Sequence, residues 1–425
     1  MKRLIGKTLS ALVVLGLLAA CSSSSKGTSS SGGTTGAVGN ASGGKNTASA
    51  PGVTATEVKV GLITEETGPA SSQAIPGIPA GFKARIAQQN ANGGVYGRKI
   101  TFIVEDDATS PAGNATAAGV ELARGAFAVD DNSALAFGAA KTLQSKGVPV
   151  VGGGYDGPEW TQDPNMFSTS YSQFTKPPRY AVDPTLLKKA GAHRFAVIGY
   201  AISPSSSLAA KYESLSLQDA GFSVPYLNTS LPFGTVNTTA IALQMKQENV
   251  DSISAPIDAN TELALVNSGI QAGIKWRYIS LATGYGQEWL DNPQAVASTQ
   301  GAYFGALQVP VELHTPATIA EQAAFKKYAG FSGVPSFDWS EGWTSADLLI
   351  KGLQAAGQNP TRASFIANLR QVTSYDAGGL LSTPVNFAQY QTPPPRQCGY
   401  AVQLVGHAFV PTSSTPTCTE LVPGT

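Results

Sequence analysis

The spacing of hydrophobic and polar residues changes along the chain, from short apolar runs typical of strands to the period of about 3.6 residues typical of helices. Short apolar runs predict strands at 58–63, 99–105, 127–129 and 148–151. Between them, apolar residues at helical spacing predict helices at 79–92, at 111–124 and in a segment that ends near residue 147. Strands that alternate with helices in this way favour a parallel, doubly wound sheet.

The same rhythm restarts after a break at 163–178. We expect strands at 195–199, 223–227, 252–255 and 278–281, separated by helices at 208–220, 238–249 and 262–272. Further helices are expected at 317–328, 345–356 and 362–372, before a final pair of strands. The pattern therefore predicts two similar α/β halves, although no internal sequence repeat accompanies them.

The amino-acid composition and the absence of catalytic motifs argue against several classes of protein. Of the 425 residues, 42% are hydrophobic, which argues against a disordered chain. Acidic and basic residues balance at 28 each, whereas a nucleic-acid-binding protein needs a basic footprint. The three His are scattered, and no GxSxG or HExxH motif is present. We therefore expect no catalytic residues, no metal site, no cofactor and no nucleic-acid partner.

The N-terminus has the pattern of an export signal. Basic residues precede a short apolar run at 9–18, which is too short to span a bilayer permanently. The string LAAC ends at Cys21 and resembles the lipobox of bacterial lipoproteins, in which the Cys is lipidated. The alternative is an ordinary secretory signal in which Cys21 is incidental. We assign residues 1–20 to the signal peptide, and residues 21–55, rich in Ser and Gly, to a lipidated Cys and a flexible linker.

Cys398 and Cys418 are the remaining cysteines. In an oxidising compartment an even number of Cys favours a disulfide, here one that would pin a C-terminal hairpin with a Gly-His turn. Free buried thiols, or a metal pair with His407, are the alternatives.

Several motifs occur in an order that resembles a known family. The segment VKVGLITEETGP is followed by NANGGVYGRKITFIVEDDA, then KGVPVVGGG, MFSTS, HRFAVIGY and SEGWTSADLLIKGLQAAG. This order resembles the leucine/isoleucine/valine-binding-protein family, the type I periplasmic solute-binding proteins of ABC transporters. The resemblance covers residues 56–410.

The resemblance implies a periplasmic-binding-protein-like type I fold, with two doubly wound parallel-sheet lobes joined by three hinge crossings. On this basis, lobe 1 comprises residues 56–177 with 308–378, and lobe 2 comprises residues 178–307 with 379–425. The ligand would lie in the cleft between the lobes, where the carboxyl ends of the strands meet.

Candidate ligand-binding residues in lobe 1 follow its strands. Gln73 follows the first strand, and Asn132 and Ser133 follow the third, where the family carries serines that hold a ligand carboxylate. N-capping of the next helix is the alternative role for Asn132 and Ser133.

The glycine-rich loop after the fourth strand supplies Gly153, Gly154 and Tyr155. Glycines permit close approach of a ligand to the backbone, and Tyr155 offers a ring and a hydroxyl. A plain turn is the alternative.

In lobe 2 the candidates are Tyr200, Asp258 and Tyr285, each after a predicted strand. Asp258 would accept a ligand ammonium group, or would simply cap the helix that follows it. Trp343 stands where the family often has Tyr, and either ligand contact or core packing would account for it.

The function implied by the resemblance is that of an extracytoplasmic binding lipoprotein on the outer face of the cell membrane. It would capture an amino acid or a related carboxylate or amide by hinge closure and deliver it to an ABC transporter permease. A monomer is expected. The alternative is a ligand sensor of the same fold that reports to a membrane signalling partner.

Overall fold

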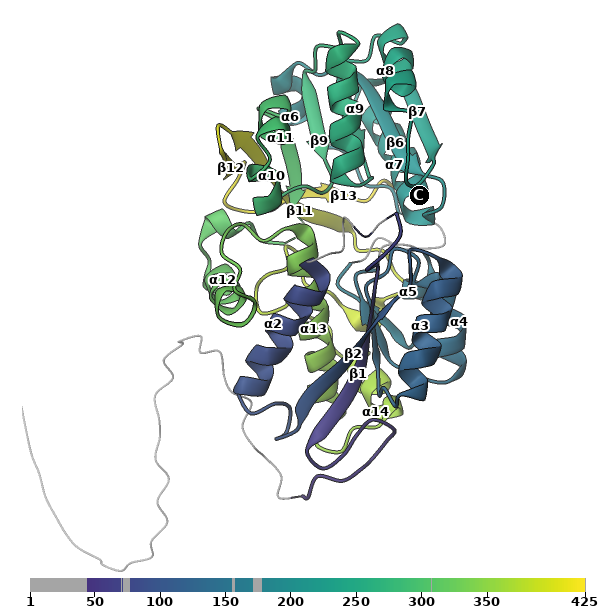
Figure 1. Ribbon diagram of the computed structural model, residues 1–425. Helices are drawn as coiled ribbons and strands as arrows, with labels where there is room; N and C mark the ends of the chain where they lie inside the picture. Colours follow the sequence, from purple (N-terminus) through teal and green to yellow (C-terminus); the bar gives the residue numbers. More distant parts are fainter. Residues whose placement is uncertain are drawn as a thin grey trace, which may run out of the picture. The chain divides into compact units, whose positions relative to one another are not determined.

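The computed structural model describes residues 44–69, 71, 77–154, 157–170, 178–306 and 308–424. The described strands form two sheets, one in each of two lobes, with helices packed on both faces (Figure 1). This two-lobe α/β architecture confirms the predicted fold class.

The first sheet is entirely parallel and has the strand order β2-β1-β3-β4-β5. Its strands are β1 (Glu57–Thr64), β2 (Lys99–Asp106), β3 (Val129–Asp131), β4 (Val150–Gly152) and β5 (Met166–Ser168). Val60 and Leu62 of β1 pack in one cluster with α2 (Gly77–Ala91), α13 (Phe337–Ala356) and α14 (Arg362–Leu369). On the other face, Ile63 packs with α3 (Pro111–Ala123) and α4 (Phe137–Ser145). Successive side chains of β1 therefore enter two different cores.

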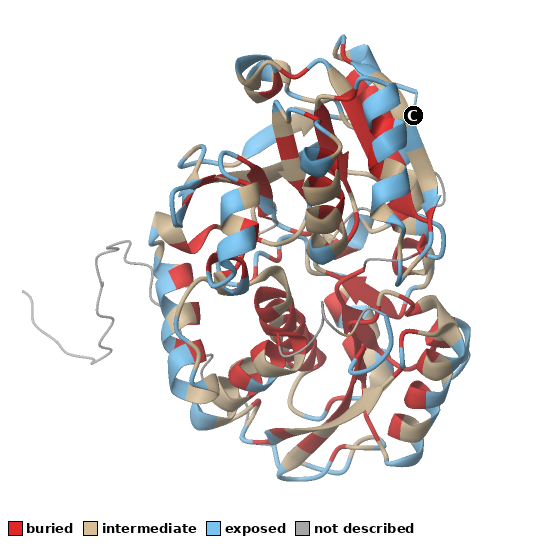
Figure 2. Ribbon diagram, turned by 45° about the horizontal axis from the view of Figure 1, so that its top comes forward, coloured by how far each residue is buried: buried red, intermediate tan, exposed pale blue. Residues whose placement is uncertain are grey.

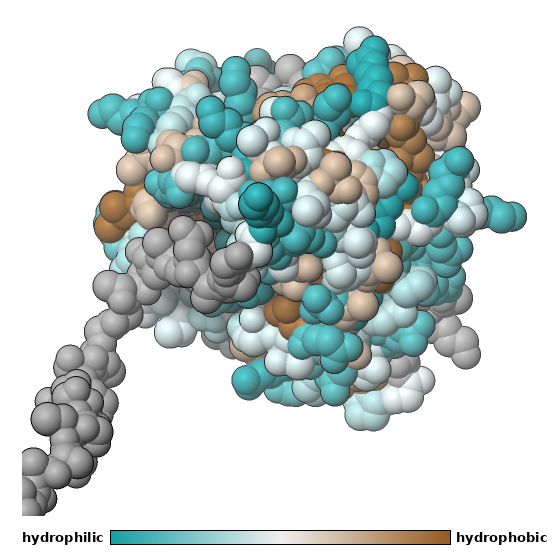
Figure 3. All heavy atoms as spheres, turned by 90° about the horizontal axis from the view of Figure 1, so that it is seen from below, coloured by the Kyte–Doolittle hydropathy of each residue, from teal (hydrophilic) through white to brown (hydrophobic). Residues whose placement is uncertain are grey.

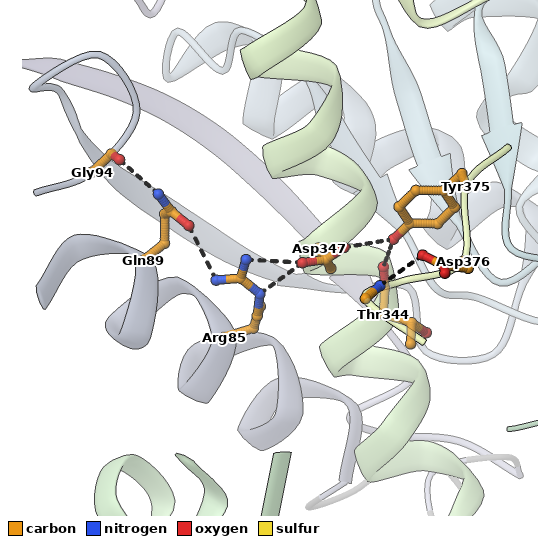
Figure 4. Close-up of polar contacts among 8 residues, drawn as sticks. Arg85, Gln89, Gly94, Thr344, Asp347, Tyr375 and Asp376 are labelled. Atoms are coloured by element: carbon orange, nitrogen blue, oxygen red, sulfur yellow. Dashed lines mark hydrogen bonds and ion pairs between the residues drawn. The ribbon is translucent and has the colours of Figure 1, made fainter. Parts of the chain in front are cut away.

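Polar contacts lock α2 against α13 (Figure 4). Arg85 of α2 donates through Nε to Oδ1 of Asp347 on α13 at 2.9 Å and through Nη1 to Gln89 at 3.2 Å. The Tyr375 hydroxyl donates to Oδ2 of the same Asp347 at 3.0 Å. Both carboxylate oxygens of Asp347 are thus engaged, which fixes the register of the two helices.

The second sheet has the strand order β12-β11-β10-β9-β8-β6-β7, with β13 also paired to β11. Its strands are β6 (Arg194–Tyr200), β7 (Ser223–Leu231), β8 (Ser252–Ala255), β9 (Tyr278–Leu281), β10 (Tyr303–Ala306), β11 (Arg396–Val405), β12 (Ala408–Pro411) and β13 (Thr417–Glu420). The sheet is mixed rather than parallel, because the C-terminal strands return to its edge and β11 runs antiparallel to β10, β12 and β13.

The remaining helices are α5 (Glu159–Gln162), α6 (Pro184–Ala190), α7 (Pro204–Asp219), α8 (Thr238–Gln247), α9 (Ala259–Gln271), α10 (Gln287–Leu290), α11 (Pro293–Ser298) and α12 (Pro316–Ala329), with short 3₁₀ turns at Val311–Leu313 and Phe387–Gln389. Five helices begin with a capping side chain followed by proline. In each, the cap accepts a first-turn amide hydrogen and proline supplies the φ that a helix needs. These starts are Ser110-Pro111, Asp183-Pro184, Ser203-Pro204, Asn292-Pro293 and Thr315-Pro316.

Some predicted boundaries are wrong. The third strand lies at Val129–Asp131 rather than at 127–129, so two acidic residues that the pattern placed in a loop are in the sheet. Helix α13 begins at Phe337 instead of 345, because Trp339 and Trp343 extend its buried face. Strands β5 and β10 escaped prediction because each is short.

Part of the segment expected to be linker is hydrogen-bonded to the first lobe. Residues 44–50, within the segment 21–55, are fastened to the first lobe by hydrogen bonds. Arg98, 1% exposed, donates to the carbonyls of Thr47 and Thr54, at 3.0 and 2.6 Å, and to the side chain of Asn359. Ser49 donates to the carbonyl of Pro360 at 2.7 Å. Residues whose composition looks like linker material thus supply main-chain carbonyls that accept hydrogen bonds from a buried guanidinium. Residues 21–43 lie outside the described residues.

The C-terminal hairpin is formed by β11 and β12, which meet at the exposed Gly406-His407 turn. Cys398 and Cys418 are directly opposite each other on β11 and β13 and form a disulfide. Because their sulfurs are bonded to each other, the free-thiol and metal-pair alternatives do not apply.

Buried residues follow the strands and the inner sides of the helices (Figure 2). On the face shown in Figure 3, polar and apolar residues are interspersed. Exposed large apolar side chains such as Leu243, Ile319 and Val405 belong to different elements. Among the described residues, no helix combines the length and the apolar character that crossing a membrane would require.

Candidate functional site

A cavity of about 480 Å³ lies at the carboxyl ends of the second sheet's strands. Most of its lining comes from the second lobe: the end of β6, the loop after β7 and the start of α9. The first lobe contributes the loop after β1. The lining residues are Pro69, Tyr200, Phe233, Gly234, Thr235, Asp258, Asn260 and Thr261. Two of the predicted ligand-binding residues, Tyr200 and Asp258, are thus brought together in one cavity.

Asp258 is both an N-cap and a cavity residue. It directly precedes α9, and its Oδ1 accepts a hydrogen bond from the amide of Thr261 at 2.9 Å. Its Oδ2 accepts a hydrogen bond from the hydroxyl of Tyr200. Both roles that the sequence suggested for Asp258 are therefore geometrically compatible, because a helix cap lies where backbone N–H groups point toward a ligand.

Tyr200 is held rigidly beside Asp258. Its amide donates to Ser206 Oγ at 2.8 Å, and Ser206 in turn donates to the carbonyl of Pro256. Its ring packs edge-on against Phe233, with 4.6 Å between ring centroids. Burial, followed by the neighbouring Asp258 carboxylate, raises the pKa of Tyr200, so its hydroxyl remains a donor at neutral pH. The result is an aromatic wall with a carboxylate at its edge.

The first lobe presents Pro69 on a braced loop. Asp106, at the end of β2, accepts hydrogen bonds from the amides of Glu66 and Thr67 at 2.9 and 3.1 Å and from the Thr67 hydroxyl. Burial opposes ionisation of Asp106, but these hydrogen bonds and that of Ala108 lower its pKa. A Cβ placed on Gly234 would be 3.7 Å from Cβ of Pro69, so loops of the two lobes approach each other at the cavity.

Asn132 and Ser133 lie instead in a buried polar network at the end of β3. Asn132 donates to Asp130 and, at 2.9 Å, to Ser345 Oγ. Ser133 donates to Asp107 and accepts from the amide of Leu135 at 2.8 Å. Neither residue is the N-cap of α4 or lines the described cavity.

Gly153 and Gly154 form a tight turn after β4. Ser168 of β5 donates to the carbonyl of Gly153 at 2.9 Å, and Gly154 has φ of +73°. A Cβ on Gly154 would overlap the Ser168 side chain, so this turn requires glycine for close packing. Tyr155 and Gln73 lie outside the described residues.

Tyr285 and Trp343 are core residues. The Tyr285 hydroxyl donates to Glu312 Oε2 at 2.6 Å and accepts from the amide of Val311 at 3.0 Å. Trp343 packs on Phe325, with 5.3 Å between ring centroids. Neither lines the cavity, although Tyr285 does follow β9 as predicted.

The sequence reasoning missed the loop after β7, which supplies Phe233, Gly234 and Thr235. It ended this strand at residue 227, whereas β7 continues to Leu231. A polar, poorly alternating stretch (NTSL) concealed the strand end, and with it the cavity loop. No cluster of three or more His, Cys, Asp or Glu suited to a metal ion occurs among the described residues.

Comparison with known proteins identifies the family. A family model described as "Periplasmic binding protein" matches residues 57–408. No curated protein matches the chain in sequence.

Solved structures share the fold. An ABC transporter solute-binding protein from R. palustris in complex with benzoate has 17% identity and a TM-score of 0.67, covering 86% of this chain and 98% of that one. A fatty acid ABC transporter substrate-binding protein from Thermomonospora curvata has 18% identity and a TM-score of 0.69, covering 88% and 95%. A branched-chain amino acid ABC transporter protein from Thermus thermophilus with bound valine has 16% identity and a TM-score of 0.69, covering 85% and 96%.

The family match spans the first sheet, most of the second sheet and the loops that form the cavity between the lobes, and the chain therefore belongs to the periplasmic binding protein family, whose members carry ligands rather than transform them.

Proposed function

We propose that this protein captures a small molecule in the cavity around Asp258 and delivers it to the permease of an ABC transporter. The observation that carries the proposal is the pairing of Tyr200 with Asp258 at a cavity to which the opposite lobe contributes Pro69. A ligand there would touch both lobes and so favour a closed arrangement.

The cavity lining favours a ligand with an amine and an apolar part. Asp258 is the charged residue of the lining, and it retains lone pairs that a ligand N–H group would occupy. Tyr200 and Phe233 offer an apolar wall. Among the structural relatives, one is in complex with benzoate, one has bound valine, and one belongs to a fatty acid transporter. Of these classes the amino acid suits Asp258 best, because this carboxylate would repel a ligand that carries only an anion near it.

We propose the lobe boundaries given above: lobe 1 at 56–177 with 308–378, and lobe 2 at 178–307 with 379–425. The sheets support them. The strands of the first sheet lie within 57–168, and those of the second lie within 194–306 and 396–420. The three connections between the two lobes are the proposed hinge.

The family acts outside the cytoplasm. We propose that Cys21 carries a lipid that holds the protein at the outer face of the membrane, with residues 22–43 as the free tether. The fastening of residues 44–50 to the first lobe supports a tether that leaves from that lobe. A monomer suits this arrangement.

A thermal-shift screen of the chain without its first 20 residues tests the ligand class. The panel contains amino acids, amines, amides, benzoates and fatty acids. Binding to the folded state alone stabilises it by about 2.7 kcal/mol at 100 times Kd. We expect a shift with an amine-bearing ligand; a shift with benzoates or fatty acids alone would refute the assignment.

Asp258→Asn then tests the site. Asn is as good a helix cap as Asp, so the fold is expected to persist while the ligand shift is lost. Asp183→Asn is the matched control, since Asp183 caps α6 in the same way and lies away from the cavity. A ligand shift unchanged in Asp258→Asn would place binding elsewhere.

A further inference from the structure

The described part of the chain buries far more acidic than basic side chains. Arg98 is the buried basic residue of this part. The buried acidic residues are Glu65, Asp107, Glu121, Asp130, Asp131, Asp258, Glu262, Glu321 and Glu341. Asp and Glu are almost never fully buried unless they are paired, so this imbalance requires an explanation.

Glu121 is the clearest case in the first lobe. It lies on α3 and is fully buried against β1, and neither of its carboxyl oxygens has a side-chain hydrogen-bond partner. The carboxyl group occupies the space above Gly61, where a Cβ would overlap it. Its ionisable neighbours are Asp130 and Asp131 of β3 and Glu105 of β2, all of them acidic.

The basic residues around Glu121 are engaged elsewhere. Lys59 of β1 donates to the carbonyl of Arg124 at 3.4 Å. Arg124, at the end of α3, forms an ion pair with Glu105 at 2.6 Å. Lys141 on α4 is exposed. Glu121 is therefore surrounded by carboxyl groups without a cation of its own.

The second lobe repeats this arrangement. Glu262, in the first turn of α9, is fully buried, and neither carboxyl oxygen has a side-chain partner. Its acidic neighbours are Glu213 of α7, which accepts a hydrogen bond from Ser254, and Asp258. Tyr278 of β9 is the other titratable group close to Glu213 and Glu262.

The lysines of α7 and α8 are exposed and lie outside this buried cluster. Lys246 of α8 donates to the carbonyl of Gly273 at 2.7 Å, and Lys211 of α7 is exposed. Helix α11 carries no charged residue.

The buried Arg98 and two half-buried arginines, in turn, bind main-chain carbonyls. Besides Arg98, Arg362 donates to the carbonyls of Ala126 and Phe127 at 2.8 and 2.9 Å. Arg370 donates to the carbonyl of Pro164 at 3.0 Å. Such bonds need no ionised carboxylate, so they persist when acidic side chains are protonated.

We infer that this protein is built to work in acidic surroundings: the carboxyl groups of Glu121 and Glu262 are buried among other acidic side chains without a side-chain partner, and the arginines of the interior bind carbonyls that do not titrate. The low content of charged residues, 13% against about 25% in typical globular domains, agrees with this. The inference needs no ligand and stands independently of the proposed transport function.

The sign of the pH dependence follows from burial. Burial, followed by acidic neighbours, raises the pKa of Glu121 to about 10 and that of Glu262 well above its usual value, and burial raises the pKa of Glu321 to about 8. A carboxyl whose pKa is raised by folding favours the folded state fully below its unfolded pKa, near 4.5. As pH rises toward the folded pKa, each such group lowers the folding equilibrium constant by about tenfold per pH unit.

The opposite sign applies to Asp106 and Asp183. Hydrogen bonds from Thr185 lower the pKa of Asp183. For Asp106, burial raises the pKa, but its hydrogen bonds outweigh burial and lower it overall. Their contribution is lost as pH falls below about 4. Stability is therefore expected to peak on the acidic side, near pH 4 to 5.

Thermal and urea unfolding of the chain without its first 20 residues, from pH 3.5 to 8.5, tests this. We expect the unfolding midpoint to be highest near pH 4 to 5 and to fall toward pH 8. Glu121→Gln and Glu262→Gln, whose amides mimic a neutral carboxyl, should each reduce this fall, whereas Glu248→Gln at an exposed site should not.

A midpoint that is highest at pH 7 or above in the unsubstituted protein would overturn the inference. The inference would also fail if the unfolding midpoint peaked at acidic pH but fell equally steeply toward pH 8 in both Gln variants, because other groups would then be titrating. Should one variant fail to fold, the other variant and the pH profile of the unsubstituted protein still decide.

Discussion

Replacing Gly61 with Ala tests the contact between β1 and the buried carboxyl group. Gly61 lies in a central strand, paired with β2 on one side and β3 on the other. A Cβ at this position would come closer than 3.0 Å to three atoms of the Glu121 carboxyl group. The substitution therefore adds a methyl group where the core is already full.

Two effects of opposite sign compete in Gly61→Ala. Ala can adopt the strand conformation of residue 61. Because Ala has less conformational freedom than Gly in the unfolded chain, this effect alone would stabilise the protein by about 0.4–1 kcal/mol. Overpacking a filled core costs about 1–3 kcal/mol. Because Glu121 sits between the sheet and α3, it has little room to move, and we expect net destabilisation of about 1–2 kcal/mol.

Urea unfolding in a double-mutant cycle isolates the contact. Glu121→Ala removes the carboxyl group and leaves space that the methyl group of Gly61→Ala would enter. The two substitutions should therefore couple by at least about 1 kcal/mol, with the double variant more stable than the sum predicts. Additive effects within about 0.5 kcal/mol would refute the reasoning, since Gly61 would then not be required by Glu121.

Three further predictions concern the fastening of the chain and the cavity. Arg98→Ala should destabilise the protein by about 2 kcal/mol or more, because it removes several hydrogen bonds to a charged, buried guanidinium, and should speed hydrogen exchange of residues 44–50. Replacing Cys398 and Cys418 with Ser should cost about 3 kcal/mol, and dithiothreitol should then no longer lower the melting temperature. Tyr200→Phe should weaken ligand binding measured by calorimetry, because Tyr200 lines the cavity. The control Tyr285→Phe also loses a hydroxyl bonded to a carboxylate, but it should lower only the stability of the protein. Equal effects of the two substitutions on ligand binding would contradict the assigned cavity.

Hydrophobic periodicity was sufficient to predict most elements and the two-lobe fold. Strong alternation in β1 and β2, and a proline after a capping residue at 110–111, place these elements within a residue or two. Periodicity failed at the start of α13. There Asp338, Ser340 and Glu341 interrupt the apolar residues, so no continuous apolar stripe marks a helix.

The site was harder to predict, because strand order brings together loops that are far apart in the sequence. Tyr200 and Asp258 meet because β6 and β8 are neighbours in the sheet, as the rule for carboxyl ends of parallel strands implies. The same rule selected Asn132 and Ser133, whose side chains are directed into the lobe by buried acidic partners. A sequence pattern fixes which residue follows a strand but not the direction in which its side chain points.

The position of Asp258 links the cavity to the buried carboxyl cluster behind it. Its two oxygens already accept hydrogen bonds from Thr261 and Tyr200, so it is oriented before any ligand arrives. Glu262, one turn farther along the same helix, would repel an ionised Asp258 if it were itself ionised. Burial, followed by the acidic neighbours Glu213 and Asp258, raises the pKa of Glu262 and favours its neutral form, so that no second negative charge builds up behind Asp258. The buried Glu262 is therefore compatible with the proposed binding role of Asp258 only while Glu262 keeps its proton.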